Sequence, residues 1–130
     1  MKIAIPRLGR ILLVAIQQDL SDDEALAFQS NLLSTIAEIE ALGVVVDISA
    51  LDVVDSFMAR VINDTASMAR LLGAEVIVCG IQPFVALTLV EMGRELIGAE
   101  CVFNLEQALK KLKTSIRSRA DMSMPEDSYE

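Results

Sequence analysis

Carboxylates are the side chains of this sequence best suited to chemistry. Five aspartates lie near the predicted ends of strands and helices: Asp22, Asp23, Asp47, Asp52 and Asp55. Sites on α/β sheets usually form at the carboxyl ends of the strands, and carboxylates gathered there bind Mg²⁺, as in a phospho-receiver domain. The alternative is structural, because acids at helix N-termini complement the helix dipole. We favour this alternative, since a receiver begins directly with a strand and a helix, whereas this chain begins with a predicted hairpin.

The composition excludes several other kinds of chemistry. The chain has no histidine, so it lacks imidazole bases, imidazole metal ligands and Ser-His or Cys-His pairs. It also lacks the GxxxxGK(S/T) and GxGxxG loops that bind nucleotide phosphates. Cys79 and Cys101 stand in apolar runs, which predicts buried structural thiols rather than a zinc or redox pair. We therefore expect no enzyme activity, no cofactor and no metal.

Charge and hydropathy indicate the environment. The net charge of -8 has the wrong sign for a nucleic-acid partner. The N-terminus lacks the apolar stretch of a signal peptide, and no apolar run approaches the roughly 20 residues that cross a membrane. We expect a cytoplasmic protein of one domain, because 130 residues are typical of one.

The first part of the chain predicts a hairpin, a helix and an inner strand. β-Branched runs at residues 2–5 and 11–16 flank a turn. Ser21 begins a capping box and an amphipathic helix that extends to about Leu42 or Gly43. The next apolar run, residues 44–48, is typical of a strand covered on both faces.

The middle of the chain predicts a second helix after a loop at residues 49–55. The helix begins near Ser56 and ends before Gly73, which suits a left-handed C-cap. A short strand follows at residues 76–79, and Pro83 suits the first turn of a third helix.

The last elements complete the predicted fold. Residues 101–103 form a strand and Asn104 caps a final helix. The fold class is α/β: a single domain over residues 1–117 with a mixed, mostly parallel sheet, an opening β-hairpin and about four helices. Residues 118–130 are expected to be a flexible C-terminal tail.

One stretch is distinctive and resembles the signature of STAS domains, the fold of bacterial anti-sigma-factor antagonists. The signature runs aspartate, apolar, two variable, apolar, two variable, apolar, Asp-Ser or Asp-Thr. The matching positions are Asp47, Ile48, Leu51, Val54, Asp55 and Ser56. The predicted order of elements also agrees with that fold, so the resemblance covers roughly residues 2–116.

Within this family, the chain looks like the small scaffold and kinase antagonist of the stressosome. Simple antagonists continue Ser-Ser-Gly-Leu-Gly, whereas this chain reads Ser56-Phe57-Met58-Ala59-Arg60. The segment that begins Gly-Ile-Gln-Pro at Gly80 is similar to the corresponding segment of those scaffolds. A simple anti-sigma-factor antagonist, which binds an anti-sigma kinase directly, is the nearest alternative.

The resemblance implies a phosphorylation switch at Ser56. A partner serine kinase would be held by the unmodified protein and would phosphorylate Ser56, and a phosphatase would reset it. The other implied partner is a STAS co-scaffold that carries a sensor domain. The position of Ser56 fits, because unpaired amides and the positive dipole end of a helix favour a phosphate. Alternatively, Ser56 is an ordinary helix N-cap.

The residues around Ser56 are candidates for a partner-binding surface. Asp52 and Asp55 would form a negative patch that phosphorylation deepens. Phe57 is either core or an apolar anchor for a partner, and Arg60 pairs with the phosphate, pairs with Asp64 or is solvated. The third helix has almost no polar face, which predicts contact with another subunit and hence a homo-oligomer, a dimer or larger.

Overall fold

The computed structural model describes residues 3–93 and 99–123, with side chains described as far as Arg119. Its elements follow in the order β1 (Arg7–Leu8), β2 (Ile11–Ala15), α1 (Asp22–Ile39), β3 (Gly43–Asp47), α2 (Ser56–Leu71), β4 (Glu75–Cys79), α3 (Pro83–Glu91), β5 (Glu100–Val102) and α4 (Leu105–Ser123). This alternation of strands and helices confirms the predicted α/β class.

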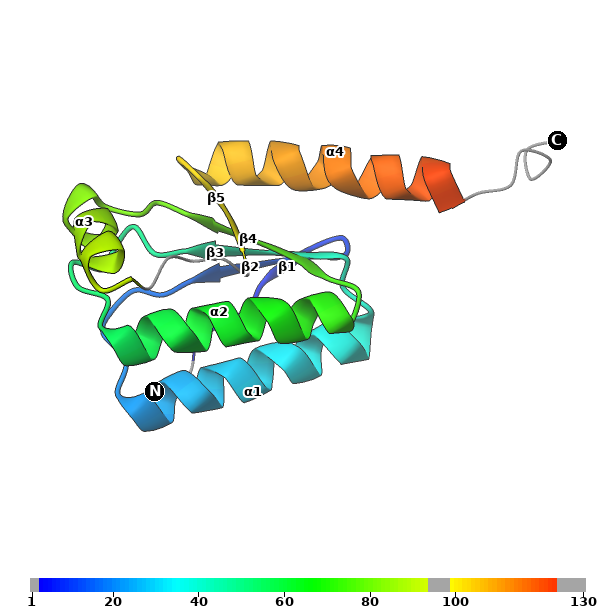
Figure 1. The fold of residues 1–130 in the computed structure, drawn as a ribbon. Helices are drawn as coiled ribbons and strands as arrows, with labels where there is room; N and C mark the ends of the chain where they lie inside the picture. Colours follow the sequence, from blue (N-terminus) through cyan, green and yellow to red (C-terminus); the bar gives the residue numbers. More distant parts are fainter. Residues whose placement is uncertain (1–2, 94–98, 124–130) are drawn as a thin grey trace, which may run out of the picture.

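The strands form one five-stranded sheet in the order β1-β2-β3-β4-β5. β1 and β2 form an antiparallel hairpin, and all the other neighbours are parallel. Helices α1 and α2 cover one face of the sheet and α4 covers the other (Figure 1). The N-terminus of α2 and the short helix α3 both lie at the end of the sheet toward which the parallel strands run (Figure 1). The fold therefore brings the loop before α2 close to α3.

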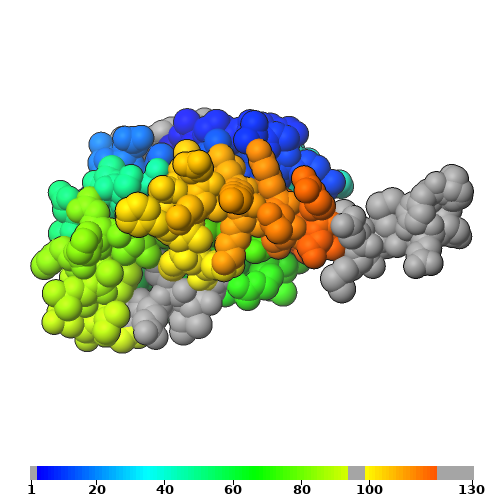
Figure 2. Space-filling model, turned by 90° about the horizontal axis from the view of Figure 1, so that it is seen from above, coloured from blue at the N-terminus to red at the C-terminus, as the bar shows by residue number. Residues whose placement is uncertain are grey.

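The two faces of the sheet carry cores of different size. Under α1 and α2, 25 described residues form one buried apolar cluster that includes Leu12, Leu32 and Val46. On the α4 face the buried cluster has six members: Ile11, Val45, Ile77, Cys79, Ala108 and Leu112. Seen from the α4 side, the helix crosses the middle of the molecule and leaves the β1–β2 side uncovered (Figure 2). The larger core therefore supports the face to which α2 belongs.

Helix α1 begins as the sequence predicts and ends earlier. Ser21 Oγ accepts from the N–H of Glu24, and the Ser21 N–H donates to Glu24 Oε1, which completes the capping box. The bond from the Ser21 backbone lowers the pKa of the Glu24 carboxyl. The helix stops at Glu40, which adopts the left-handed conformation with φ 53°. Gly43, expected near the helix end, is instead the first residue of β3.

The opening hairpin is present, but its first strand is displaced. The predicted strand at residues 2–5 is wrong where the structure describes it, because residues 3–5 form no strand and residue 2 lies outside the described residues. β1 consists instead of Arg7 and Leu8, within the segment assigned to the turn. Gly9, with φ 62°, occupies the turn itself. The Leu13 N–H donates to Pro6 O over 2.8 Å, so the chain before β1 also contacts β2.

Helix α2 ends at the predicted glycine. Gly73 has φ 94°, and its N–H donates to Arg70 O over 3.0 Å. The Ala74 N–H donates to Ala69 O over 2.9 Å. These two bonds form a Schellman motif, for which a residue without a Cβ is favoured at the left-handed position.

Two expectations about the end of the chain are corrected. Helix α4 continues through Ser123, so residues 118–123, assigned to the tail, are helical, and residues 124–130 lie outside the described residues. Cys101, expected to be buried, is exposed on β5 because this strand lies at the sheet edge. Asn104 does cap α4, since its Oδ1 accepts from the Gln107 N–H over 2.9 Å.

Candidate functional site

The loop between β3 and α2 presents polar groups over two apolar anchors. Leu51 and Val54 are almost fully buried in the larger core, and the Leu51 N–H donates to Ile48 O over 3.0 Å. Asp52 and Val53 between these anchors are exposed, and 53% of the Val53 surface is accessible. The loop is therefore anchored at two points and offers its tip to solvent.

Asp55, not Ser56, caps helix α2. Its Oδ1 accepts from the N–H of Met58 over 2.8 Å, and its backbone is extended with φ -81°. Ser56 is the first residue of the helix and is exposed. The alternative interpretation of Ser56 as an ordinary N-cap is therefore wrong, because the neighbouring aspartate performs that role.

The Ser56 hydroxyl is not used by the fold. Among the described residues it makes no hydrogen bond or ion pair, whereas the adjacent Asp55 carboxylate does. The amides of Ser56 and Phe57 in the first turn also lack a partner among the described residues, as expected at a helix N-terminus. A group attached to Ser56 would thus find hydrogen-bond donors within its own turn without displacing the cap.

The other predicted surface residues behave differently from one another. Asp52 and Asp55 are both exposed, and Asp55 directly precedes Ser56 in the chain. Phe57 is half-buried and packs against the larger core, which favours the core interpretation over the anchor interpretation. Arg60 faces solvent with its Nε 4.0 Å from Asp64 Oδ2, an exposed pair that contributes little to stability.

A shallow hollow beside the loop adds two residues that sequence reasoning missed. It has a volume of about 120 Å³ and is lined in part by Asp19 and Leu20 from the β2–α1 loop and by Val53 and Asp55. Asp19 and Asp55 both give this hollow negative charge, and the side chains of Leu20 and Val53 give it an apolar wall. No local pattern could have placed Asp19 and Asp55 at the same hollow, because their proximity depends on the register of β2 against β3.

The receiver-like magnesium site is not supported by the fold. A receiver has the strand order 2-1-3-4-5, whereas this sheet is ordered sequentially and begins with an antiparallel hairpin. Over residues 3–93 and 99–123, no group of three or more Cys, Asp or Glu residues is placed to hold a metal ion. Asp22 and Asp23 lie in the first turn of α1, where they complement the helix dipole.

Comparison with known proteins decides the family. The family model described as the STAS domain matches residues 2–116. The chain belongs to the STAS domain family. Among solved structures, RsbS from Moorella thermoacetica, in a form with serine replaced by glutamate, is similar with 38% identity and a TM-score of 0.79, covering 90% of this chain and 99% of that one.

Two further relatives connect this STAS domain to one kind of assembly. A chain from the molecular architecture of the stressosome, described as a signal integration and transduction hub, is 39% identical with a TM-score of 0.72, covering 88% of this chain and 99% of that chain. The RsbT co-antagonist protein RsbRA of Bacillus subtilis (strain 168) is 29% identical over 92 residues, which are 71% of this chain and 34% of RsbRA. The matched region thus spans about a third of RsbRA, and this chain is an RsbS-like STAS domain.

Helix α3 of the STAS domain has one buried side and one exposed apolar side. Val85 and Leu89 are buried in the larger core. Phe84, Leu87 and Val90 are 62%, 54% and 64% exposed. The predicted contact between α3 and another subunit is not tested by a single chain and stays a prediction.

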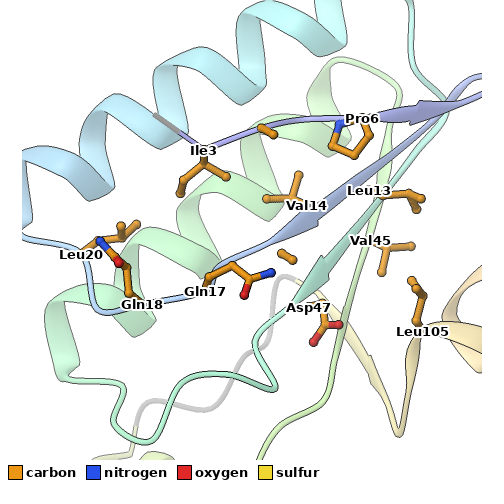
Figure 3. Close-up of a pocket in the computed structure, with 12 residues that line it drawn as sticks. Ile3, Pro6, Leu13, Val14, Gln17, Gln18, Leu20, Val45, Asp47 and Leu105 are labelled. Carbon is orange, nitrogen blue, oxygen red and sulfur yellow. The ribbon is translucent and has the colours of Figure 1, made fainter. Parts of the chain in front are cut away.

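A second hollow lies along β2 and is lined from both faces of the STAS sheet, because Val14 belongs to the larger core and Leu13 packs against the cluster under α4. It has a volume of about 350 Å³ and is mainly apolar, with Leu13 and Val45 from the sheet and Leu105 from α4 in its wall. Figure 3 shows Asp47 and Gln17 as polar groups at its edge. It lies beside the start of α4, and neither Ser56 nor its neighbours line it.

The two thiols differ in environment. Burial raises the pKa of the Cys79 thiol to about 11, and the charge of Asp47 adds to the effect. Desolvation also raises the pKa of the Cys101 thiol, with Glu100 contributing. Neither sulfur is activated as a nucleophile, because activation requires a lowered pKa.

In the part of the chain that the structure describes, no helix combines the length and hydropathy needed to cross a bilayer.

Proposed function

We propose that this protein is a non-enzymatic stressosome scaffold that holds a serine kinase of the RsbT type and releases it when Ser56 is phosphorylated. The observation that carries the proposal is that Asp55 and Ser56 have separate roles at the start of α2. Asp55 caps the helix, and the exposed Ser56 hydroxyl has no structural role among the described residues. A kinase can therefore modify Ser56 without removing a bond that holds the helix.

The relatives support the assembly. Similarity extends over nearly the whole of RsbS and of the stressosome chain, and RsbRA is named for its antagonism of RsbT. The proposed partners are accordingly an RsbT-like serine kinase, an RsbR-like STAS co-scaffold with a sensor domain, and a phosphatase that resets Ser56. A cytoplasmic location, expected from the sequence, stays a prediction.

The switch would act through local charge. A phosphoserine adds about -1.5 to -2 charges at pH 7. Asp55 directly precedes Ser56, Asp52 lies four positions before it, and Asp19 lies with Asp55 in the same hollow, so the added charge increases an existing negative potential. Arg60, one turn away, is engaged with Asp64. A coupling of about 1 to 3 kcal/mol is enough to change partner affinity about 5- to 150-fold.

The partner surface would combine this charge with apolar contacts. Val53 is exposed beside Asp52, and it shares a hollow with Leu20 and Asp55. An apolar contact rimmed by charge is typical of specific, regulated interfaces. The exposed apolar side of α3 is the proposed surface for homo-oligomers or for the co-scaffold.

Co-purification with the kinase tests the proposal. In the presence of ATP, Ser56→Ala is expected to retain the kinase throughout, whereas wild type is expected to retain it only until Ser56 is phosphorylated. Ser56→Asp is expected to retain less kinase than either. Ser67→Ala is the matched control, because Ser67 is exposed on the same helix. Intact-mass analysis should show one added phosphate on wild type and Ser67→Ala and none on Ser56→Ala. Absence of phosphate on wild type, or equal kinase retention by Ser56→Asp and Ser56→Ala, contradicts the proposal.

Electron microscopy separates the scaffold from the simple anti-sigma-factor antagonist. Mixed with an RsbR-like co-scaffold, this protein is expected to form large particles. A simple antagonist would bind an anti-sigma kinase and form no large assembly, so complexes limited to that kinase would favour the alternative.

A further inference from the structure

The segment Gly80 to Pro83 contacts the loop that leads to Ser56. The Gln82 side chain donates from Nε2 to the backbone oxygen of Ser49 over 2.7 Å. The two residues are 33 positions apart, so this bond links the β4–α3 turn to the β3–α2 loop. This segment is also one in which the sequence resembles the stressosome scaffolds, and the phosphorylation switch alone gives it no role.

Gly80 brings the two backbones close enough for that bond. It adopts φ 79°, and a Cβ at this position would lie 2.7 Å from Ser49 Cβ and 2.9 Å from Asp47 Oδ1. Any side chain at Gly80 would therefore push the loop away. The close approach is a feature of the fold and requires a glycine.

Each of the two residues in this hydrogen bond is also fixed by other contacts. Gln82 is the residue before α3, whose Val85 and Leu89 are buried in the larger core. On the loop side, the Ser49 N–H donates to Asp47 Oδ1 over 2.9 Å. The Ser49 peptide is thus fixed on one side by β3 and on the other by the start of α3.

We propose that Gln82 is a positioning residue for the phosphorylation of Ser56. Its amide fixes the Ser49 carbonyl, which holds the start of the loop and thereby limits the conformations of the exposed Asp52–Val53 tip that a kinase must recognise. This inference rests on the proposed function for its kinase step and goes beyond it by assigning a role to a residue on a different element. Binding of a second protein to α3 would change the position of the Ser56 loop through the same hydrogen bond.

Loss of the bond has a specific kinetic signature. A loop that spends only part of its time in the recognised conformation binds with its affinity reduced by that fraction. Once bound, the Ser56 hydroxyl presents the same chemistry, so the effect appears in KM and not in kcat. The size expected for one neutral hydrogen bond is about a fivefold rise in KM.

Two variants and one control test the inference. Gln82→Met keeps the length of the side chain and removes the N–H donor, whereas Gln82→Glu places an acceptor against the Ser49 carbonyl and should have the larger effect. Glu91→Gln is the control, because Glu91 is exposed at the far end of the same helix. Steady-state phosphorylation of each full-length protein by the kinase gives KM and kcat, and circular dichroism confirms that each variant is folded.

Amide hydrogen exchange supplies a second readout that needs no kinase. The N–H groups of Ser49 and Leu51 are bonded within the loop, to Asp47 Oδ1 and to Ile48 O. In both Gln82 variants these two amides should exchange faster, whereas the amides of β3 should not change. Glu91→Gln should match wild type in exchange and in kinetics.

The two readouts separate failure of this inference from failure of the proposed function. If no kinase phosphorylates wild-type Ser56, the proposed function fails. Faster exchange in the variants would still show that the Gln82 hydrogen bond restrains the loop. Unchanged exchange at Ser49 and Leu51, or a folded variant with faster exchange and an unchanged KM, overturns the positioning role of Gln82. A fall in kcat at constant KM overturns it as well, because it would place Gln82 in a later step.

Discussion

The helices on the two faces of the sheet are held by apolar cores of different size. Under α1 and α2 the described residues form a continuous core of 25 buried residues, and the anchors of the Ser56 loop, Leu51 and Val54, belong to it. On the other face only six buried residues lie under α4. The candidate site is therefore built on the face with the larger apolar core.

Polar links supplement the smaller core under α4 without replacing it. Ser115 Oγ donates to Glu75 Oε1 over 2.6 Å, and Arg119 donates to Leu42 O over 3.0 Å and to Gly73 O over 3.4 Å. Lys111 also pairs with Glu100. Such links contribute about 1 kcal/mol each or less, so α4 should separate from the sheet more readily than α1 or α2.

Truncation in the larger core should have the greatest effect. Leu32 on α1 is 0% exposed, and Leu32→Ala leaves a cavity and removes buried apolar surface. The expected loss is about 2–5 kcal/mol in the free energy of unfolding, measured by urea denaturation. Leu26→Ala on the exposed side of α1 is the control and should lose far less. A loss below about 1 kcal/mol at Leu32 would contradict the importance of this face.

Truncation under α4 should loosen one helix without unfolding the rest. Leu112 is 0% exposed, and its methyl groups occupy the space above Gly43, where a Cβ would lie 2.9 Å from Leu112 Cδ2. Leu112→Ala is expected to cost about 2 kcal/mol, near the lower limit for buried leucines, because α4 can move to fill the space. Cys79, buried in the same cluster, should then react with a thiol reagent in the native state.

Cys101 is an internal standard for that measurement. It is exposed, so its thiol should react in wild type and in Leu112→Ala at equal rates. Lys110→Ala, on the exposed side of α4, should leave Cys79 protected. If Cys79 stays protected in Leu112→Ala, the α4 face is as tightly packed as the other face.

Alkaline pH should weaken the α4 face through Cys79. The pKa of this thiol rises from 9.0 to about 11 on folding, chiefly because of burial. The folded state therefore keeps a proton that the unfolded state loses, so stability is complete below pH 9 and falls as pH rises through 11. The expected loss is on the order of 1 kcal/mol at pH 10. Cys79→Ala should show a smaller loss over this interval in urea denaturation, and an equal loss in both proteins would refute the assignment.

The smallest effect is expected from a single polar link under α4. Ser115→Ala removes the donor to Glu75, and the expected loss is about 0.5–1 kcal/mol because one part-buried hydrogen bond is exchanged for water. Ser118→Ala, at an exposed position of the same helix, is the matched control. A loss at Ser115 as large as that of Leu112→Ala would mean that polar links, rather than the apolar cluster, hold α4.

Features that depend on a few neighbouring residues could be predicted from the sequence. The capping box of Ser21 and the left-handed cap at Gly73 require only local spacing, and both are confirmed. The end of α1 could not be predicted, because Glu40 adopts a conformation that glycine usually supplies. The two-residue strand β1 was also missed, since Pro6 and Gly9 suggest a turn and only pairing with β2 makes Arg7–Leu8 a strand.

The candidate site shows the same division. The motif places Ser56 at the start of α2, and this is confirmed, but both Asp55 and Ser56 are good caps and the pattern could not choose between them. The link from Gln82 to Ser49 depends on the parallel pairing of β3 with β4, which no local pattern encodes. The exposure of Cys101 likewise depends on β5 being the sheet edge.

The sequential order of the strands has a consequence for synthesis of the chain. Each strand pairs with the strand that precedes it in the sequence, so no strand has to insert between two that are already paired. A nascent chain can therefore extend the sheet from its first edge as the residues emerge from the ribosome, and α1 and α2 can cover their face before α4 is made. Helix α4 follows the other described elements in the sequence, so the apolar face beneath it stays open longer than the face under α1 and α2, and this face is where we expect chaperone contact during synthesis.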